Sequence, residues 1–174
     1  MEFKTEIASL NDIDGIMRLV NNAYRGETAK QGWTHEANLI EGSYRIDKLT
    51  LLKQFGKADS IILKCTDKNE TIIGCVYLEK KGNTLYLGML AVKPELQAKG
   101  IGKSLLKAAD IYAKEKSCNK IEMTVISVRT ELIEWYKRNG YNESGTILPF
   151  DVNPQFGVPT QRLEFCVMEK EVDS

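Results

Sequence analysis

At 174 residues the chain has the length of one domain, and its 43% hydrophobic and 28% charged residues argue against disorder. Lys and Arg number 24, as do Asp and Glu, so no overall charge favours nucleic acid or an acidic membrane surface. The start of the chain lacks the basic and apolar segments of a signal peptide, and no apolar run reaches the roughly 18 residues that span a membrane. We therefore expect one cytoplasmic domain over residues 1–174.

The cysteines are widely spaced, form no CxxC pair and are accompanied by a single histidine. This pattern argues against a zinc site and against a disulfide framework. We expect no bound metal and four buried thiols in a reducing cytoplasm, at Cys65, Cys75, Cys118 and Cys166.

Hydrophobic periodicity and turn residues divide the chain into helices and strands. In chain order, the expected elements are a strand at 3–7, a helix at 12–24 begun by Asn11, a loop or broken helix at 25–44, a helix at about 45–55, strands at 60–66, 71–80 and 84–92, a helix at about 100–116, a strand at 120–126, a helix at 130–138, and strands at 141–148 and 161–170. This order predicts an α/β (α+β) domain of three layers, with helices on both faces of a mixed, mostly antiparallel sheet of about seven strands.

The segment between the strand ending at Val92 and the longest helix carries the clearest functional signal. Pro94 ends the strand, and Gly100-Ile101-Gly102 opens the helix. The first amides of a helix have no partner within it, and the helix dipole favours an anion there. The segment therefore predicts a phosphate or pyrophosphate site, to which Lys99 and Lys103 add charge.

Two common nucleotide motifs do not fit this segment. A Walker A loop needs a glycine five residues before Gly102, where Gln97 stands. A dinucleotide-binding fingerprint needs a glycine three residues after Gly102, where Leu105 stands. A plain glycine-rich helix start remains the structural alternative.

The pattern Gln97-x-x-Gly100-x-Gly102 resembles the Q/R-x-x-G-x-G/A motif of the GNAT superfamily of N-acetyltransferases, and the order of elements resembles that family over nearly the whole chain. The resemblance implies that the loop amides hold the pyrophosphate of coenzyme A and that a splayed, bulged strand end pairs with its pantetheine arm. Gly88 suits such a bulge, since glycine inside a strand often marks one. The residues expected to bind the cofactor are Leu90, Ala91, Val92, Gln97, Ala98, Lys99, Gly100, Ile101, Gly102, Lys103, Ser104 and Arg129.

Acetyl transfer to an amine needs a donor to the carbonyl oxygen, a proton for the leaving thiolate and a neutral amine. The amide of Leu90 is the candidate donor. Tyr136, within a segment that resembles the family's Y-x-x-x-G-[FY] helix end, is the candidate general acid, and a packing tyrosine beside Leu132 and Trp135 is the alternative. The family often has asparagine and alanine where this chain has Arg129 and Leu132, so Arg129 would contact the cofactor as a charge.

The segment 25–45 is expected to cover the acceptor, because loops on a rigid scaffold commonly carry specificity. Trp33 is either a lid or an anchor on the core, and Glu36 is a candidate to hold a cationic amine. His35 is either catalytic or a solvated loop residue. Glu79, His35 and Glu36 are the candidate general bases, with a relay through water as the alternative.

These features favour an N-acetyltransferase that moves an acetyl group from acetyl-CoA to a primary amine of a small molecule or peptide by direct attack in a ternary complex. A catalytically silent acyl-CoA-binding sensor of the same fold is the alternative, and a P-loop nucleotide-binding protein is a third. The expected partners are acetyl-CoA and the amine, with no nucleic acid and no membrane, and a homodimer remains open.

Overall fold

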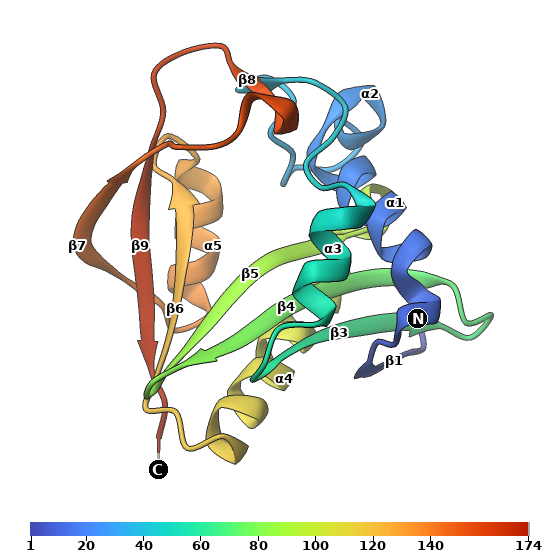
Figure 1. The fold of residues 1–174 in the computed structure, drawn as a ribbon, viewed down its shortest axis with the longest axis vertical. Helices are drawn as coiled ribbons and strands as arrows, with labels where there is room; N and C mark the ends of the chain where they lie inside the picture. Colours follow the sequence, from blue (N-terminus) through green and yellow to red (C-terminus); the bar gives the residue numbers. More distant parts are fainter. Residues whose placement is uncertain (174) are drawn as a thin grey trace.

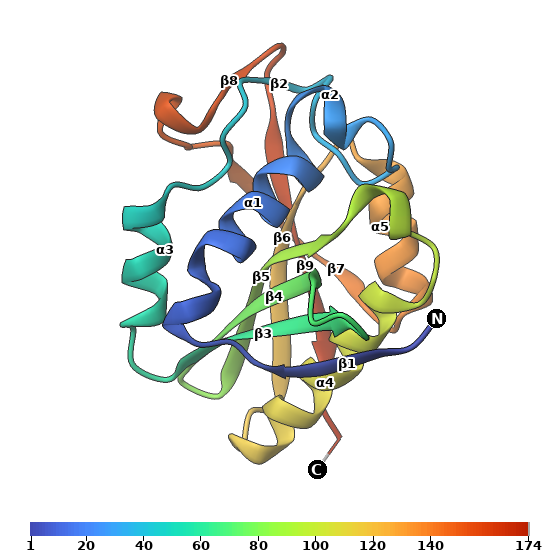
Figure 2. The ribbon, with the colours of Figure 1, turned by 90° about the vertical axis from the view of Figure 1, so that its right-hand side faces the viewer.

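The computed structural model describes residues 1–173 as a sheet enclosed between two layers of helices (Figures 1 and 2). Its seven strands run in the order β1-β3-β4-β5-β6-β9-β7, and every neighbouring pair is antiparallel except β5 and β6. This confirms the expected fold class. The strands of this sheet are β1 (Phe3–Ile7), β3 (Ser60–Asp67), β4 (Ile72–Lys81), β5 (Thr84–Val92), β6 (Lys120–Ile126), β7 (Asn142–Pro149) and β9 (Glu164–Glu171).

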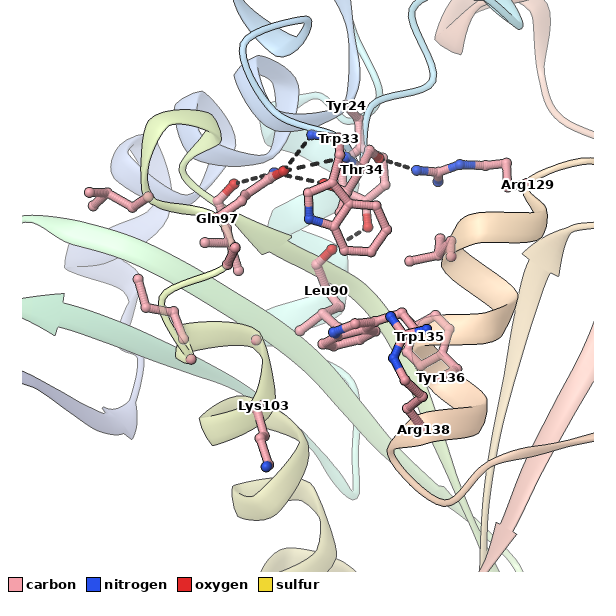
Figure 3. A pocket seen from close by; sticks show the side chains of 17 residues that line it. Tyr24, Trp33, Thr34, Leu90, Gln97, Lys103, Arg129, Trp135, Tyr136 and Arg138 are labelled. Carbon is pink, nitrogen blue, oxygen red and sulfur yellow. Dashed lines mark hydrogen bonds between the residues drawn. The ribbon is translucent and has the colours of Figure 1, made fainter.

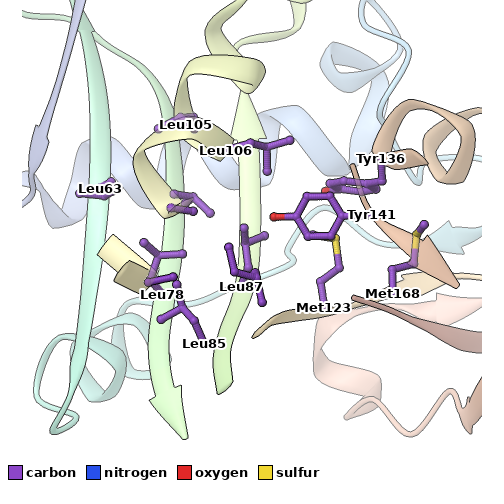
Figure 4. Packing of buried hydrophobic residues seen from close by; sticks show 14 of the residues in the cluster. Leu63, Leu78, Leu85, Leu87, Leu105, Leu106, Met123, Tyr136, Tyr141 and Met168 are labelled. Carbon is purple, nitrogen blue, oxygen red and sulfur yellow. The ribbon is translucent and has the colours of Figure 1, made fainter. Parts of the chain in front are cut away.

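Helices cover both faces of the sheet, as Figure 2 shows. Helices α1 (Ile13–Tyr24) and α3 (Lys48–Phe55) bury their apolar residues against one face. Helices α4 (Ile101–Glu115) and α5 (Thr130–Arg138) do so against the other. In this second cluster Leu105 and Leu106 of α4 pack over Leu87 of β5, while Tyr136 of α5 lies beside Tyr141 (Figure 4). All four cysteines are buried free thiols, as predicted.

One predicted boundary was wrong, and one pair of short strands was not predicted. Asn11 is not the N-cap of α1, because it lies within a 3-10 turn, Leu10–Asp12, that precedes the helix. The amide of Ser9 donates to the carboxylate of Asp12 (2.8 Å), which closes that turn. The segment 25–44, expected to be a loop or broken helix, contains the short helix α2 (Gly26–Ala29), as a broken helix would. It also contains β2 (Ile40–Glu41), paired with β8 (Val158–Pro159), and this pair of strands was not predicted. A two-residue strand carries no periodic signal that a sequence can show.

Strand β5 contains a β-bulge that reverses the faces to which its side chains point. The register between β4 and β5 shifts opposite Met89, whose φ is 54°. Before the bulge Leu85 and Leu87 belong to the cluster under α4, whereas Met89 and Ala91 belong to the cluster under α1. In a regular strand these four residues would share one face. The bulge predicted near Gly88 is therefore present.

Strands β5 and β6 pair only at their first residues. The parallel ladder joins Thr84, Leu85 and Tyr86 to residues 120–122, and beyond it the two strands diverge. The amide of Lys93 donates to the carbonyl of Ile73 on β4 (2.9 Å). By the alternation of a strand, the peptide groups of Leu90 and Val92 point away from β4, into the space between the diverging strands. No helix within residues 1–173 is both long enough and apolar enough to cross a membrane.

Candidate active site

The connection from β5 to α4 presents unpaired peptide N–H groups. The backbone is left-handed at Ala98 (φ 65°) and at Gly100 (φ 88°), the residue that caps α4. A Cβ on Gly100 would meet open space, so its φ is the reason for glycine. The amide of Ser104 donates to the carbonyl of Gly100 (3.0 Å), which is the first bond of the helix. The amides of residues 101–103 precede that bond, so they are free to bind an anion.

At residue 102 glycine is favoured for a different reason, because little space is left for a side chain. A Cβ on Gly102 would lie 3.3 Å from the ring of Trp135 and 3.8 Å from a methyl group of Val92. Glycine therefore allows α4, α5 and the end of β5 to approach each other around the helix start. This contact keeps the indole of Trp135 on the wall of the cleft that the free amides face (Figure 3).

The cleft holds about 380 Å³ and lies between the β5–α4 connection and α5 (Figure 3). Three of the predicted cofactor-binding residues do not line it. Ala91 is buried on the α1 face, Lys99 is exposed, and the amide of Ser104 is used within the helix. The predicted cofactor-binding residues that line the cleft are Leu90, Val92, Gln97, Ala98, Gly100, Ile101, Gly102, Lys103 and Arg129.

The side chain of Gln97 joins the β5–α4 connection to the segment after α2. Its Oε1 accepts from the amides of Trp33 (2.8 Å) and Thr34 (3.3 Å). Its Nε2 donates to Oγ1 of Thr34 (2.7 Å) and to the carbonyl of Val92 (3.2 Å). A Cβ on Gly32 would lie 2.4 Å from Oε1 of Gln97, so glycine is needed beside this amide group. Sequence reasoning assigned only the backbone of Gln97 to the site.

A second cavity of about 310 Å³ lies where β5 and β6 diverge. Its wall comes from β5, β6, α5 and the ends of α1 and the loop before α3. The two cavities adjoin each other, because five residues line both of them. These shared residues are Tyr24, Leu90, Arg129, Leu132 and Tyr136.

Tyr136 is buried, with 6% of its surface exposed, and lies at the junction of the two cavities. Its ring makes edge contacts with Trp135 (5.0 Å between centroids) and Tyr141 (5.7 Å). Burial raises the pKa of its phenol far above the ordinary value, so the group stays protonated at every physiological pH. The side chain therefore packs in the core and also presents a proton donor at the junction.

Buried charges lie beside the second cavity. The Nε of Arg25 lies 3.2 Å from Oε1 of Glu36, and a guanidinium nitrogen of Arg129 lies 3.9 Å from Oε2. Glu36 lines the second cavity, is 8% exposed and already pairs with two cations, so its carboxylate is largely neutralised before an acceptor binds. A third guanidinium, that of Arg45, lies 4.5 Å from the centre of the Tyr24 ring.

Three further candidates lie outside the second cavity. Trp33 is 37% exposed at the mouth of the first cleft, where its ring meets the edge of Trp135. His35 lines neither cavity; its Nδ1 accepts from the amide of Ala37 (3.2 Å), and burial, then the charge of Arg129, lowers its pKa. Glu79 also lines neither cavity, and its carboxylate accepts a hydrogen bond from the hydroxyl of Tyr77 (2.5 Å). These positions give His35 and Glu79 no direct approach to the junction.

The family model described as acetyltransferase (GNAT) family matches residues 21–141, more than half of the chain. This chain belongs to the GNAT family. A curated relative, thialysine N-epsilon-acetyltransferase from Bos taurus, is 31% identical over 64 residues, which are 37% of this chain and 38% of that enzyme.

Solved structures of this family share the whole fold. The ribosomal-protein-S18-alanine N-acetyltransferase of Escherichia coli superposes with a TM-score of 0.75 at 13% identity, covering 99% of this chain and 96% of its own. The PaiA N-acetyltransferase of Thermoplasma acidophilum, solved in complex with coenzyme A, superposes with a TM-score of 0.72 at 22% identity, covering 98% and 99%. At these identities the likeness shows the fold. GNAT membership supports acyl transfer in general and the binding of coenzyme A.

Two residues of this GNAT site escaped sequence reasoning. Tyr24 is the last residue of the helix expected at 12–24, where apolar spacing indicates only a packing residue, yet its hydroxyl donates to the carbonyl of Leu90. Burial raises its pKa, so it too remains a phenol. Arg45 is the last residue of the segment 25–45, which was expected to cover the acceptor, but it was given no role of its own. Nothing local in the sequence distinguishes either residue, because each is defined by a partner far along the chain.

Proposed function

We propose that this chain transfers an acetyl group from acetyl-CoA to the primary amine of a small molecule or peptide by direct attack in a ternary complex. The observation that carries the proposal is the junction of two cavities at Leu90 and Tyr136. One cavity ends at the free amides of a helix start, which suit a pyrophosphate. The other has room for a small acceptor.

The residues of the first cleft fit coenzyme A. The amides of Ile101, Gly102 and Lys103 are placed to hold the pyrophosphate, with the Lys103 side chain adding charge. The N–H groups of Leu90 and Val92, which point away from β4, are available for the pantetheine arm, as a strand pairs with a strand edge, whereas the two carbonyls already accept from Tyr24 and Gln97. Acetyl-CoA, when bound, supplies an acyl group activated as a thioester.

Leu90 and Tyr136 divide the chemical work at the junction. The N–H of Leu90, beside the bulge, is aimed between the diverging strands, where it stabilises negative charge on the acyl oxygen. The new N–C bond forms as the C–S bond breaks. Tyr136 supplies one proton to the departing sulfur, the amine gives up one proton to water, and water returns a proton to the Tyr136 phenolate. Burial raises the pKa of the leaving thiol as well as that of the Tyr136 phenol. The free energy of proton transfer from Tyr136 to the thiolate therefore stays small although the pKa of Tyr136 is high.

The test combines binding with turnover. Acetyl-CoA is titrated into the protein, and release of free thiol is then followed across a panel of amines. The proposal expects both saturable binding and amine-dependent release. Binding without release on any amine would instead favour a silent acyl-CoA sensor, and absence of binding would reject the cofactor assignment.

A further inference from the structure

The lining of the second cavity carries more positive than negative side chains. The charged side chains among the described residues that line it are Glu36, Arg45 and Arg129. Arg25 lies directly behind Glu36 and pairs with it at 3.2 Å. Arg25 and Arg129 both pair with Glu36, and Arg45 leaves the lining with more guanidinium groups than carboxylates, so the wall carries net positive charge.

Among these arginines, Arg45 has N–H donors left to bind a ligand. The ion pairs formed within residues 1–173 do not include it, and its guanidinium is held in place by the face of the Tyr24 ring. Arg25 and Arg129 are committed elsewhere: Arg25 to Glu36 and to the carbonyls of Tyr44 and Phe156, and Arg129 to the carbonyl of Thr34. Arg45 thus presents a planar fork of N–H donors, which matches a carboxylate.

We infer that the acceptor is a small primary amine that also carries a carboxylate, as an α-amino acid does, and that Arg45 binds this carboxylate. The inference rests on the proposed acetyl transfer and names its substrate class. The cavity of about 310 Å³ suits a molecule of this size. Met123, Leu132 and Phe165 form an apolar part of the wall, against which the body of the substrate packs.

The same positive charge acts on the reacting amine. Nearby cations disfavour an ammonium and lower the pKa of the amine, which raises the fraction that is neutral and able to attack. A polyamine, by contrast, would have to place a second ammonium among the arginines without a free carboxylate to meet it. The acetyl group moves from sulfur to the amine nitrogen, the sulfur takes a proton from Tyr136, and the amine proton passes to water and so back to Tyr136; the substrate carboxylate takes no part in the bond changes.

The experiment measures thiol release from acetyl-CoA with matched pairs of amines. Each α-amino acid is compared with the amine that remains when its carboxyl group is removed, for example L-lysine with 1,5-diaminopentane and L-phenylalanine with 2-phenylethylamine. Spermidine and O-phosphoethanolamine complete the set. We expect kcat/KM to favour the carboxylate member of the best pair by about 10- to 100-fold, the range of a charge-assisted hydrogen-bonded contact.

Variants at Arg45 separate binding of the carboxylate from a structural role. Arg45→Gln should lower kcat/KM for the preferred amino acid by about 10-fold or more, with affinity for acetyl-CoA unchanged and a clearly smaller loss for the decarboxylated amine. Arg45→Lys should restore part of the loss. Arg162→Gln, which removes an exposed arginine outside both cavities, is the matched control and should behave as the wild type.

Each outcome bears on the inference. Equal turnover of both members of every pair, a preference for spermidine, or a preference for the phosphate-bearing amine overturns it while leaving the acetyltransferase assignment intact. An equal loss of activity toward both members of a pair in Arg45→Gln shows a structural role and overturns the assignment of that residue. Absence of release with every amine removes the proposed function and the inference with it.

Discussion

The hydroxyl of Tyr24, at the last residue of α1, donates a hydrogen bond to the carbonyl of Leu90 in the bulged end of β5. The bond joins the helical layer to the strand across 66 positions of sequence. It also places a buried phenol at the wall shared by the two cavities. The orientation of the strand end that we assign to acyl binding thus depends on a side chain of another layer.

Tyr24→Phe should therefore lower kcat and also cause a modest loss in the free energy of unfolding. Loss of one hydrogen bond to the backbone typically costs about 1 kcal/mol of unfolding free energy. We expect kcat to fall about tenfold, because the peptide groups next to Leu90 lose a restraint that positions them. Chemical unfolding and steady-state kinetics on the same preparations measure both. Unchanged kcat alongside reduced stability would leave Tyr24 with a packing role alone.

Tyr136→Phe should abolish proton donation to the leaving sulfur. We expect kcat to fall by about 10²- to 10⁴-fold with affinity for acetyl-CoA nearly intact, since the ring and its contacts remain. Tyr141→Phe is the matched control, because Tyr141 packs against Tyr136 and its buried hydroxyl has no hydrogen-bond partner within the described residues. The control should keep full activity. Similar kinetics for the two variants would contradict the assignment of Tyr136 as general acid.

Gly100→Ala should weaken the binding of acetyl-CoA. A left-handed φ of 88° costs a residue with a Cβ about 1–2 kcal/mol, and the loop relieves that strain by moving its amides. Affinity should fall about tenfold in a binding titration. Gly82→Ala carries comparable strain (φ 62°) in the turn between β4 and β5, far from the cleft. It should lose stability and keep its affinity, and equal affinity loss in both would point to a global effect.

Gln97→Ala should release the segment around Trp33 and Thr34 from the cofactor cleft. The amide of Trp33 and the carbonyl of Val92 lose a partner, which should cost about 1–3 kcal/mol of unfolding free energy. Hydrogen exchange at Trp33 and Thr34 should accelerate, whereas the exposed Gln161→Ala should leave it unchanged. Exchange that stays slow in Gln97→Ala would mean that packing of the Trp33 ring holds the segment.

Asp12→Asn should lower the free energy of unfolding at neutral pH, and this loss should be smaller in acid. Burial alone raises the pKa of Asp12, but hydrogen bonds from Ser9 and from Lys64 (2.9 Å) outweigh it and hold the pKa below its ordinary value. A lowered pKa stabilises the fold above the unfolded pKa near 4, and the contribution is lost as pH falls through the folded value. We expect a gap of about 1 kcal/mol from wild type at pH 7 that narrows below about pH 4 in urea titrations. A constant gap would show that the charge of Asp12 is immaterial.

What could be read directly from the sequence was local. The apolar spacing of Ile101, Leu105 and Ala109 marked α4, and Pro94 with Gly100 marked the connection that presents its first amides. The limits of β5, β6 and α5 followed in the same way, because backbone preference and side-chain period act between residues close in the chain. Family resemblance then identified the fold and pointed to Leu90 and Tyr136 as candidates.

The remainder was decided by tertiary structure. Periodicity alone places Leu87 and Met89 on one face of a strand, and only the bulge separates them. The partners of Tyr24, Gln97 and Glu36 come from other elements of the chain, so no local pattern announces them. A side chain's role in a site depends on which groups packing brings within hydrogen-bond reach, and that is a property of the folded layers rather than of any one segment.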